Sequence, residues 1–287
     1  MSKRVLRGSV VLLFVLGVPD PGRAADHGDS PLLNEVGRND AKITDLYAFT
    51  VGSNLVVALG MNPAVPVGVS SYLFPDDLEV RILIANDSPV AFGSAEDLLV
   101  FGGTLLAPGS IDDDVSFMLK FTGGVPRLET RGFREHPSAI RLFAGLRDDP
   151  FIRGPRIGRN VAAIVLEFPL SAVKSDGDTL LLWATTKVPD VNGPIAEHGG
   201  RALRSMFPEN DVLNTSRPRD HFRLFGLVPD VVIFRTSQPA RYPNGRALED
   251  DVVDLVGDQR VLGNDSPFPS TNDKPFLTQF PYLAEPH

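Results

Sequence analysis

The chain has no cysteine among its 287 residues. This absence excludes disulfide bonds, thiolate zinc sites, catalysis by a thiol and covalent attachment of a c-type haem. A chain without such links depends for its stability on the size of its core or on a bound metal ion. The length suffices for one large domain, or for one domain with a smaller appendage, and hence for a sizeable core.

Positive charge is also scarce. The 28 Lys and Arg residues are outnumbered by 36 Asp and Glu residues, and the formal net charge is −8. No basic run with interleaved aromatic residues is present, so nucleic acid and anionic membrane surfaces are not expected partners. After residue 18 no apolar run reaches the roughly 20 residues that cross a bilayer.

The common catalytic motifs are missing as well. The sequence contains no G-x-S-x-G elbow, no P-loop and no dinucleotide-binding fingerprint. Residues 171–174 match S-x-x-K, but the companion motifs S-D-N and K-T-G are absent, so we interpret the match as chance. The motifs therefore name no reaction, and enzymatic activity is left open.

The most informative feature that is present lies at the start of the chain. Lys3, Arg4 and Arg7 precede an apolar run over residues 10–18, and the small residues Gly22 and Ala24 follow it. A charged head, a short apolar core and a small-residue cleavage region are typical of a secretory signal peptide. We expect residues 1–24 to be removed, which predicts export to the periplasm or the extracellular space with no integral membrane segment.

Apolar residues that alternate with polar ones dominate the middle of the chain. Residues 78–84 and 115–121 each place every second residue on one apolar face, and residues 161–168 and 180–185 have the composition of buried strands. These patterns favour antiparallel sheets. We predict an all-β protein, a β-sandwich over residues 25–190, with residues 191–287 forming an irregular, partly helical C-terminal wrap of the same domain.

His27 is the first candidate metal ligand. Cleavage after Ala24 would leave Ala-Asp-His at the new N-terminus, and such a start offers four nitrogens in a plane, which suits Cu²⁺. Alternatively, His27, Asp29 and Asp45 could converge with tail acids on Ca²⁺ or a transition metal. The tail acids are Asp250, Asp251 and Asp254. The competing interpretation is that all these groups serve turns, helix caps and tethers.

A second candidate site lies around Arg147, Asp148 and Arg159. A guanidinium binds planar carboxylates through two hydrogen bonds, so these residues could hold an acidic small molecule. The competing interpretation is an internal Arg–Asp lock that fixes a loop. The remaining histidines, His136, His198, His221 and His287, are isolated in the sequence and show no helical metal-site spacing.

Several segments together resemble one bacterial family, catalogued as domain-of-unknown-function family 4331. The matching segments are residues 25–31, 43–49, 143–151, 158–161, 166–171, 242–246, 250–254, 280–283 and 286–287. The resemblance covers nearly all of the chain after residue 24 and implies an exported protein, without implying an activity. Residues 163–173 also resemble the sandwich modules of the family-nine carbohydrate-binding and DOMON kinds, which bind sugars or haem.

These observations lead to one expectation and two alternatives. We expect an exported β-sandwich binding or accessory protein with a small-molecule or metal ligand, the metal being held at the mature N-terminus. The first alternative is a metal-dependent enzyme that uses His27, Asp29 and Asp45. The second is a haem- or carbohydrate-binding module.

Overall fold

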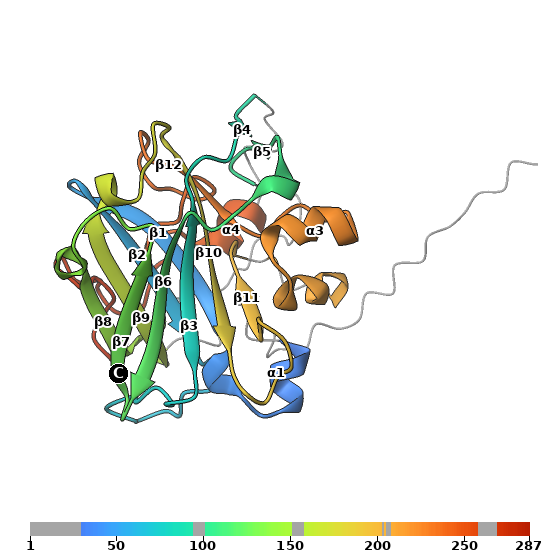
Figure 1. Ribbon diagram of the computed structural model, residues 1–287. Helices are drawn as coiled ribbons and strands as arrows, with labels where there is room; N and C mark the ends of the chain where they lie inside the picture. The colour runs from blue at the N-terminus through green and yellow to red at the C-terminus, as the bar shows by residue number, and fades with distance from the viewer. Residues whose placement is uncertain (1–29, 94–100, 151–157, 203, 205–207, 258–268) are drawn as a thin grey trace, which may run out of the picture.

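The computed structural model describes residues 30–93, 101–150, 158–202, 204, 208–257 and 269–287. Most of its regular structure is strand, arranged in antiparallel sheets that pack as a sandwich (Figure 1). The predicted all-β sandwich is therefore confirmed. Residues 1–24, expected as a signal peptide, lie outside the described residues, as do His27 and Asp29. No helix in the described ranges has the length and apolar character needed to cross a membrane.

The smaller sheet has the strand order β1-β2-β9-β8. Its strands are β1 (Ile43–Val51), β2 (Asn54–Met61), β9 (Asn160–Pro169) and β8 (Arg141–Asp148). Strand β8 is thus at the edge of the sheet, and its last residue, Asp148, lies opposite Asn160 at the start of β9. Both Asp148 and Asn160 also contact residues 284–287 at the C-terminus.

The larger sheet has the order β11-β10-β3-β6-β7, and β12 pairs with β10. Its strands are β11 (Glu197–Gly199), β10 (Thr179–Lys187), β3 (Glu79–Ala85), β6 (Val115–Thr122), β7 (Val125–Arg131) and β12 (Val232–Arg235). A short ribbon joins β4 (Val90–Ala91) to β5 (Thr104–Leu105). The helical pieces are α1 (Pro31–Glu35), η1 (Asn39–Ala41), η2 (Pro108–Ser110), η3 (Pro137–Ala139), η5 (Leu170–Ala172), η6 (Pro208–Thr215), α3 (Pro218–Phe225) and α4 (Val252–Gly257).

The main core lies between the two sheets and follows the alternation of the sequence. Every second residue of β3 and β6 is buried in this core, and the facing residues of β2, β9 and β10 complete it. Phe117 of β6 stacks on Phe168 of β9 with ring centroids 4.6 Å apart, which joins one sheet to the other. Removing this apolar surface from water drives the two sheets together.

The outer face of the smaller sheet is covered as well. Tyr282 and Leu283, near the end of the chain, pack with Leu248 on Tyr47 of β1 and Val165 of β9. Strand β9 is therefore buried on both faces, which explains why its sequence is continuously apolar rather than alternating.

The part of the chain after residue 190, expected to be an irregular wrap, also contributes to the larger sheet. His198 of β11 pairs with Thr185, and Ile233 of β12 pairs with Leu181, both on β10. Helices α3 and α4 belong to the same part and lie beside the sandwich in Figure 1. The chain after residue 190 is thus helical in places and supplies two short strands.

Candidate functional site

The structure engages Asp45 in a buried ion pair. Arg246 donates from Nη1 to Asp45 Oδ1 at 2.5 Å, and its guanidinium lies 4.1 Å from the ring centroid of Tyr47. Both charged side chains are almost inaccessible to solvent. A cation at Asp45 would have to compete with this guanidinium, which already supplies the opposite charge that a buried carboxylate needs.

The three tail acids serve local structure. Asp250 Oδ2 accepts hydrogen bonds from the backbone N–H groups of Tyr242 and Ala247, both at 2.8 Å. Asp251 Oδ1 accepts from the N–H of Asp254 at 3.1 Å, and Asp254 Oδ2 accepts from Ser270 Oγ at 2.9 Å. Such contacts are those of turns and helix starts.

The four predicted carboxylates that the structure describes do not converge on a common point. No three of Asp45, Asp250, Asp251 and Asp254 offer oxygens within 4.8 Å of one another in the described part of the chain. His27 and Asp29 lie outside the described residues, so a copper site at the mature N-terminus stays a prediction. The enzyme that uses His27, Asp29 and Asp45 stays a prediction too.

The predicted ligand-binding residues have different surroundings. Arg147 Nη1 forms an ion pair with Glu285 Oε2 at 2.5 Å, and its guanidinium lies 4.4 Å from the ring centroid of Phe143. Arg159 is exposed to solvent. Arg147 and Asp148 are consecutive residues of β8, and consecutive side chains of a strand point to opposite faces of the sheet. Asp148 belongs to a different cluster, and ligand binding by Arg147 and Arg159 stays a prediction.

That cluster consists of Asp148, Asp273 and His287. One ligand atom from each of these residues lies within 4.8 Å of the other two, and among the described residues this is the group of three or more such side chains. His287 Nε2 is 2.8 Å from Asp148 Oδ1 and 3.4 Å from Asp273 Oδ2. An imidazole nitrogen and two carboxylates thus meet at one point.

The sheet and the C-terminal segment position these three groups together. Asn160, opposite Asp148 in the sheet, accepts a hydrogen bond from the backbone N–H of His287 at 2.8 Å. The N–H of Asp148 in turn donates to the carbonyl of Ala284 at 3.3 Å. These contacts fix the end of the chain at the edge formed by β8 and β9, which brings the imidazole to the carboxylate of Asp148.

Neighbouring groups orient the two carboxylates. Asn272 Nδ2 donates to Asp148 Oδ2 at 2.7 Å and to the carbonyl of Lys274 at 2.9 Å. The backbone N–H of Gly158 donates to Asp273 Oδ2 at 2.6 Å. Asn272 thus contacts Oδ2 of Asp148, and Oδ1 faces His287. Hydrogen bonds of this kind commonly fix the orientation of metal-ligating side chains.

The electrostatics of the cluster favour a cation. The Asp148 side chain is 1 % exposed, whereas those of Asp273 and His287 are 21 % and 30 % exposed. Burial raises the pKa of Asp148 to about 6, and the nearby charge of Asp273 acts in the same direction, against the hydrogen bond from Asn272. A buried carboxylate of this kind is stabilised by a positive charge, and the more exposed partners leave a path for an ion from solvent.

Sequence reasoning selected Asp148 but missed the other two members of the cluster. Asp273 lies in a polar turn, and His287 has no potential ligand at a regular spacing in the sequence. Both reach Asp148 only because the C-terminal segment folds back over the smaller sheet. No local sequence pattern predicts this long-range contact.

Comparisons with protein-family models, with curated proteins and with solved structures give no match to this chain. The resemblance to family 4331 and the weaker resemblance to sugar- and haem-binding modules therefore stay predictions.

Proposed function

We propose that the protein is an exported β-sandwich binding protein that holds a divalent transition-metal ion at Asp148, Asp273 and His287. The observation that carries this proposal is the convergence of one imidazole nitrogen and two carboxylates around a buried, oriented Asp148. The N-terminal pattern of residues 1–24 supports the exported location.

The donor set favours Zn²⁺ over Ca²⁺. Calcium takes six to eight oxygen ligands, whereas zinc is commonly held by three or four nitrogen, oxygen or sulfur ligands. One nitrogen and two carboxylates supply three positions, and water from the exposed side completes a tetrahedral set. This proposed site uses other residues than the site predicted at the mature N-terminus, which stays a separate prediction.

An ion at this place would act as a cross-link. It would join the edge of the smaller sheet to the last residues of the chain, in a protein that has no cysteine for a disulfide bond. A ligand that binds the folded state and not the unfolded chain stabilises the fold by mass action. We therefore expect the free energy of unfolding to rise as more of the protein binds the metal ion.

The test is isothermal titration calorimetry of Zn²⁺ into the exported, processed protein. The protein should carry no polyhistidine tag, because a tag beside His287 would itself bind zinc. We expect one ion per chain, and we expect the Asp148→Asn and His287→Gln variants to raise the dissociation constant at least tenfold, since each removes a ligand. The matched control is His136→Gln, which removes an exposed histidine on a short turn that contacts Ser138.

Two results would contradict the proposal. One is the absence of saturable zinc binding by the wild-type protein. The other is loss of thermal stability in Asp148→Asn and His287→Gln with an unchanged dissociation constant for zinc, because that result assigns the cluster to ion pairing alone.

A further inference from the structure

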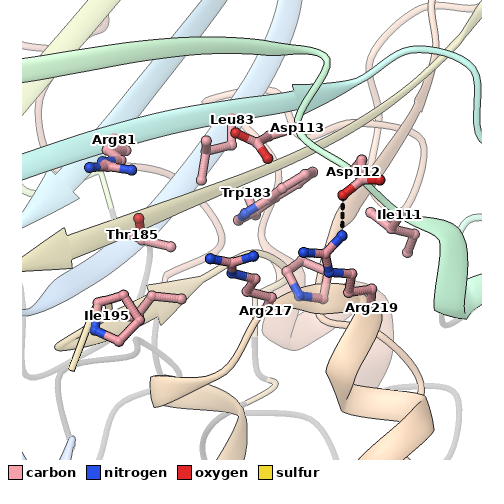
Figure 2. Close-up of a pocket in the computed structure, with 12 residues that line it drawn as sticks. Arg81, Leu83, Ile111, Asp112, Asp113, Trp183, Thr185, Ile195, Arg217 and Arg219 are labelled. Carbon is pink, nitrogen blue, oxygen red and sulfur yellow. Dashed lines mark hydrogen bonds and ion pairs between the residues drawn. The ribbon is translucent and has the colours of Figure 1, made fainter.

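A second candidate site lies on the outer face of the larger sheet, where a recess of about 120 Å³ opens between β3, β10 and the start of α3 (Figure 2). None of the metal-site residues line it. Its floor is apolar and formed by Leu83, Trp183 and Ile195, which are largely buried. Leu83 and Trp183 belong to β3 and β10 of the larger sheet, and Ile195 lies in the connection before β11.

Two hydrogen-bond donors face one another in this recess. Figure 2 shows the indole nitrogen of Trp183 directed toward the guanidinium of Arg217. Within the described part of the chain, the side chains of Trp183 and Arg217 form no hydrogen bond or ion pair with the protein. Trp183 is buried and Arg217 is exposed to solvent. The indole N–H and the guanidinium are donors only, so one acceptor between them could bind both.

Other charged groups of the recess are already paired. Arg81 forms an ion pair with Glu79 at 2.6 Å, Arg219 pairs with Asp112 (Figure 2), and Asp113 pairs with Arg131. Among the described residues that line the recess, Arg217 is thus the charged group without an ion pair, and it is exposed to solvent. An acceptor that carries negative charge completes this arrangement.

We propose that the recess binds a small organic acid. Its carboxylate would accept hydrogen bonds from Arg217 and Trp183, and its apolar part would lie on Leu83 and Ile195. The planar guanidinium matches a carboxylate with two parallel hydrogen bonds. The volume is smaller than that of typical drug-sized pockets, which restricts the ligand to about the size of benzoate.

The chain offers a built-in reporter for this proposal, because Trp183 is its single tryptophan. Benzoate is the probe, and its binding is followed by Trp183 fluorescence and by calorimetry. Benzyl alcohol tests the need for the carboxylate, and inorganic phosphate tests the need for the apolar part. We expect saturable binding of benzoate and much weaker binding of the other two compounds.

Variants at the recess test the assignment of the donors. We expect Arg217→Gln to raise the dissociation constant for benzoate about tenfold or more, as the loss of a charged hydrogen bond predicts, and Arg217→Lys to restore part of the affinity. The control is Arg127→Gln, which removes an exposed arginine of β7 on another part of the sheet. Binding should also persist in Asp148→Asn, because the metal site does not contribute.

Several outcomes would overturn the proposal. They are no saturable binding of benzoate in fluorescence and calorimetry, equal affinity for benzyl alcohol or phosphate, and an unchanged affinity in Arg217→Gln. Loss of benzoate binding in Asp148→Asn would assign the carboxylate to the metal instead and would equally contradict this site.

Discussion

At the scale of single residues, the most unusual group is the fully buried His221 on α3. Its Nδ1 accepts a hydrogen bond from the N–H of Asp230 at 3.0 Å, so its Nε2 carries the proton and donates to the carbonyl of Ser216 at 3.2 Å. Burial, together with the charge of His198, whose ring lies 5.0 Å away, lowers the pKa of His221 to about 3. The folded state therefore keeps this imidazole neutral.

The consequence is a loss of stability in acid. Between about pH 6.5 and pH 3 the unfolded chain binds a proton at His221 that the folded state does not bind, so the free energy of unfolding falls as the pH falls. Asp148 acts in the opposite sense, because its raised pKa favours the folded state at low pH and this contribution is lost as the pH rises through about 6.

A variant isolates the contribution of His221. In His221→Asn the amide oxygen replaces Nδ1 as an acceptor and does not titrate. We expect urea denaturation to show a stability gap between wild type and variant that shrinks by on the order of 2 kcal/mol from pH 7 to pH 4.5. A gap that stays constant over this range would show that His221 has the same pKa in the folded and the unfolded state, which would contradict this prediction.

The residue scale is also where sequence reasoning succeeded least. Asp148 was selected with Arg147 and Arg159 for a ligand, and strand alternation sends the side chains of Arg147 and Asp148 to opposite faces. Asp45 was selected as a metal ligand, and it forms an ion pair with Arg246, which lies far along the chain. The sequence shows neither arrangement, because the partners of a buried charge are set by tertiary packing.

At the scale of elements, the C-terminal segment holds the candidate metal centre in place. Leu283 is 1 % exposed and belongs to the cluster that covers the outer face of the smaller sheet. The adjacent Ala284 accepts the hydrogen bond from the N–H of Asp148. Apolar packing thus places His287 beside the sheet edge.

Replacing Leu283 by Ala should weaken this docking. Truncation of a buried leucine costs about 3 kcal/mol of stability, and we expect faster amide hydrogen exchange at Asp148, which loses its anchored acceptor. The control is Leu106→Ala, since Leu106 is 62 % exposed and its truncation should change stability by less than about 0.5 kcal/mol. Equal effects of the two variants would contradict a docking role for Leu283.

The sequence was more informative about strands than about residues. The alternation over residues 78–84 and 115–121 predicted β3 and β6 with their buried faces, because period-two burial is a local property. Strands β11 and β12 were not predicted, since they have only three and four residues and depend on pairing with β10. Strands this short contain too few residues for an alternation of apolar and polar residues to predict them.

At the scale of the whole molecule, the protein is a two-sheet sandwich without disulfide bonds, closed on one outer face by the last part of its own chain. A metal ion at Asp148, Asp273 and His287 would fasten that closure in a chain that has no cysteine for a disulfide bond. Such an ion would bind the buried carboxylate of Asp148 and hold the docked C-terminal segment in a protein without cysteine.

The most direct test is X-ray diffraction from crystals of the zinc-saturated protein, recorded at the zinc absorption edge. We expect an anomalous peak about 2.0–2.2 Å from oxygens of Asp148 and Asp273 and from Nε2 of His287. Crystals whose only zinc peaks lie elsewhere, with the imidazole of His287 still in contact with Asp148, would contradict the proposed metal site.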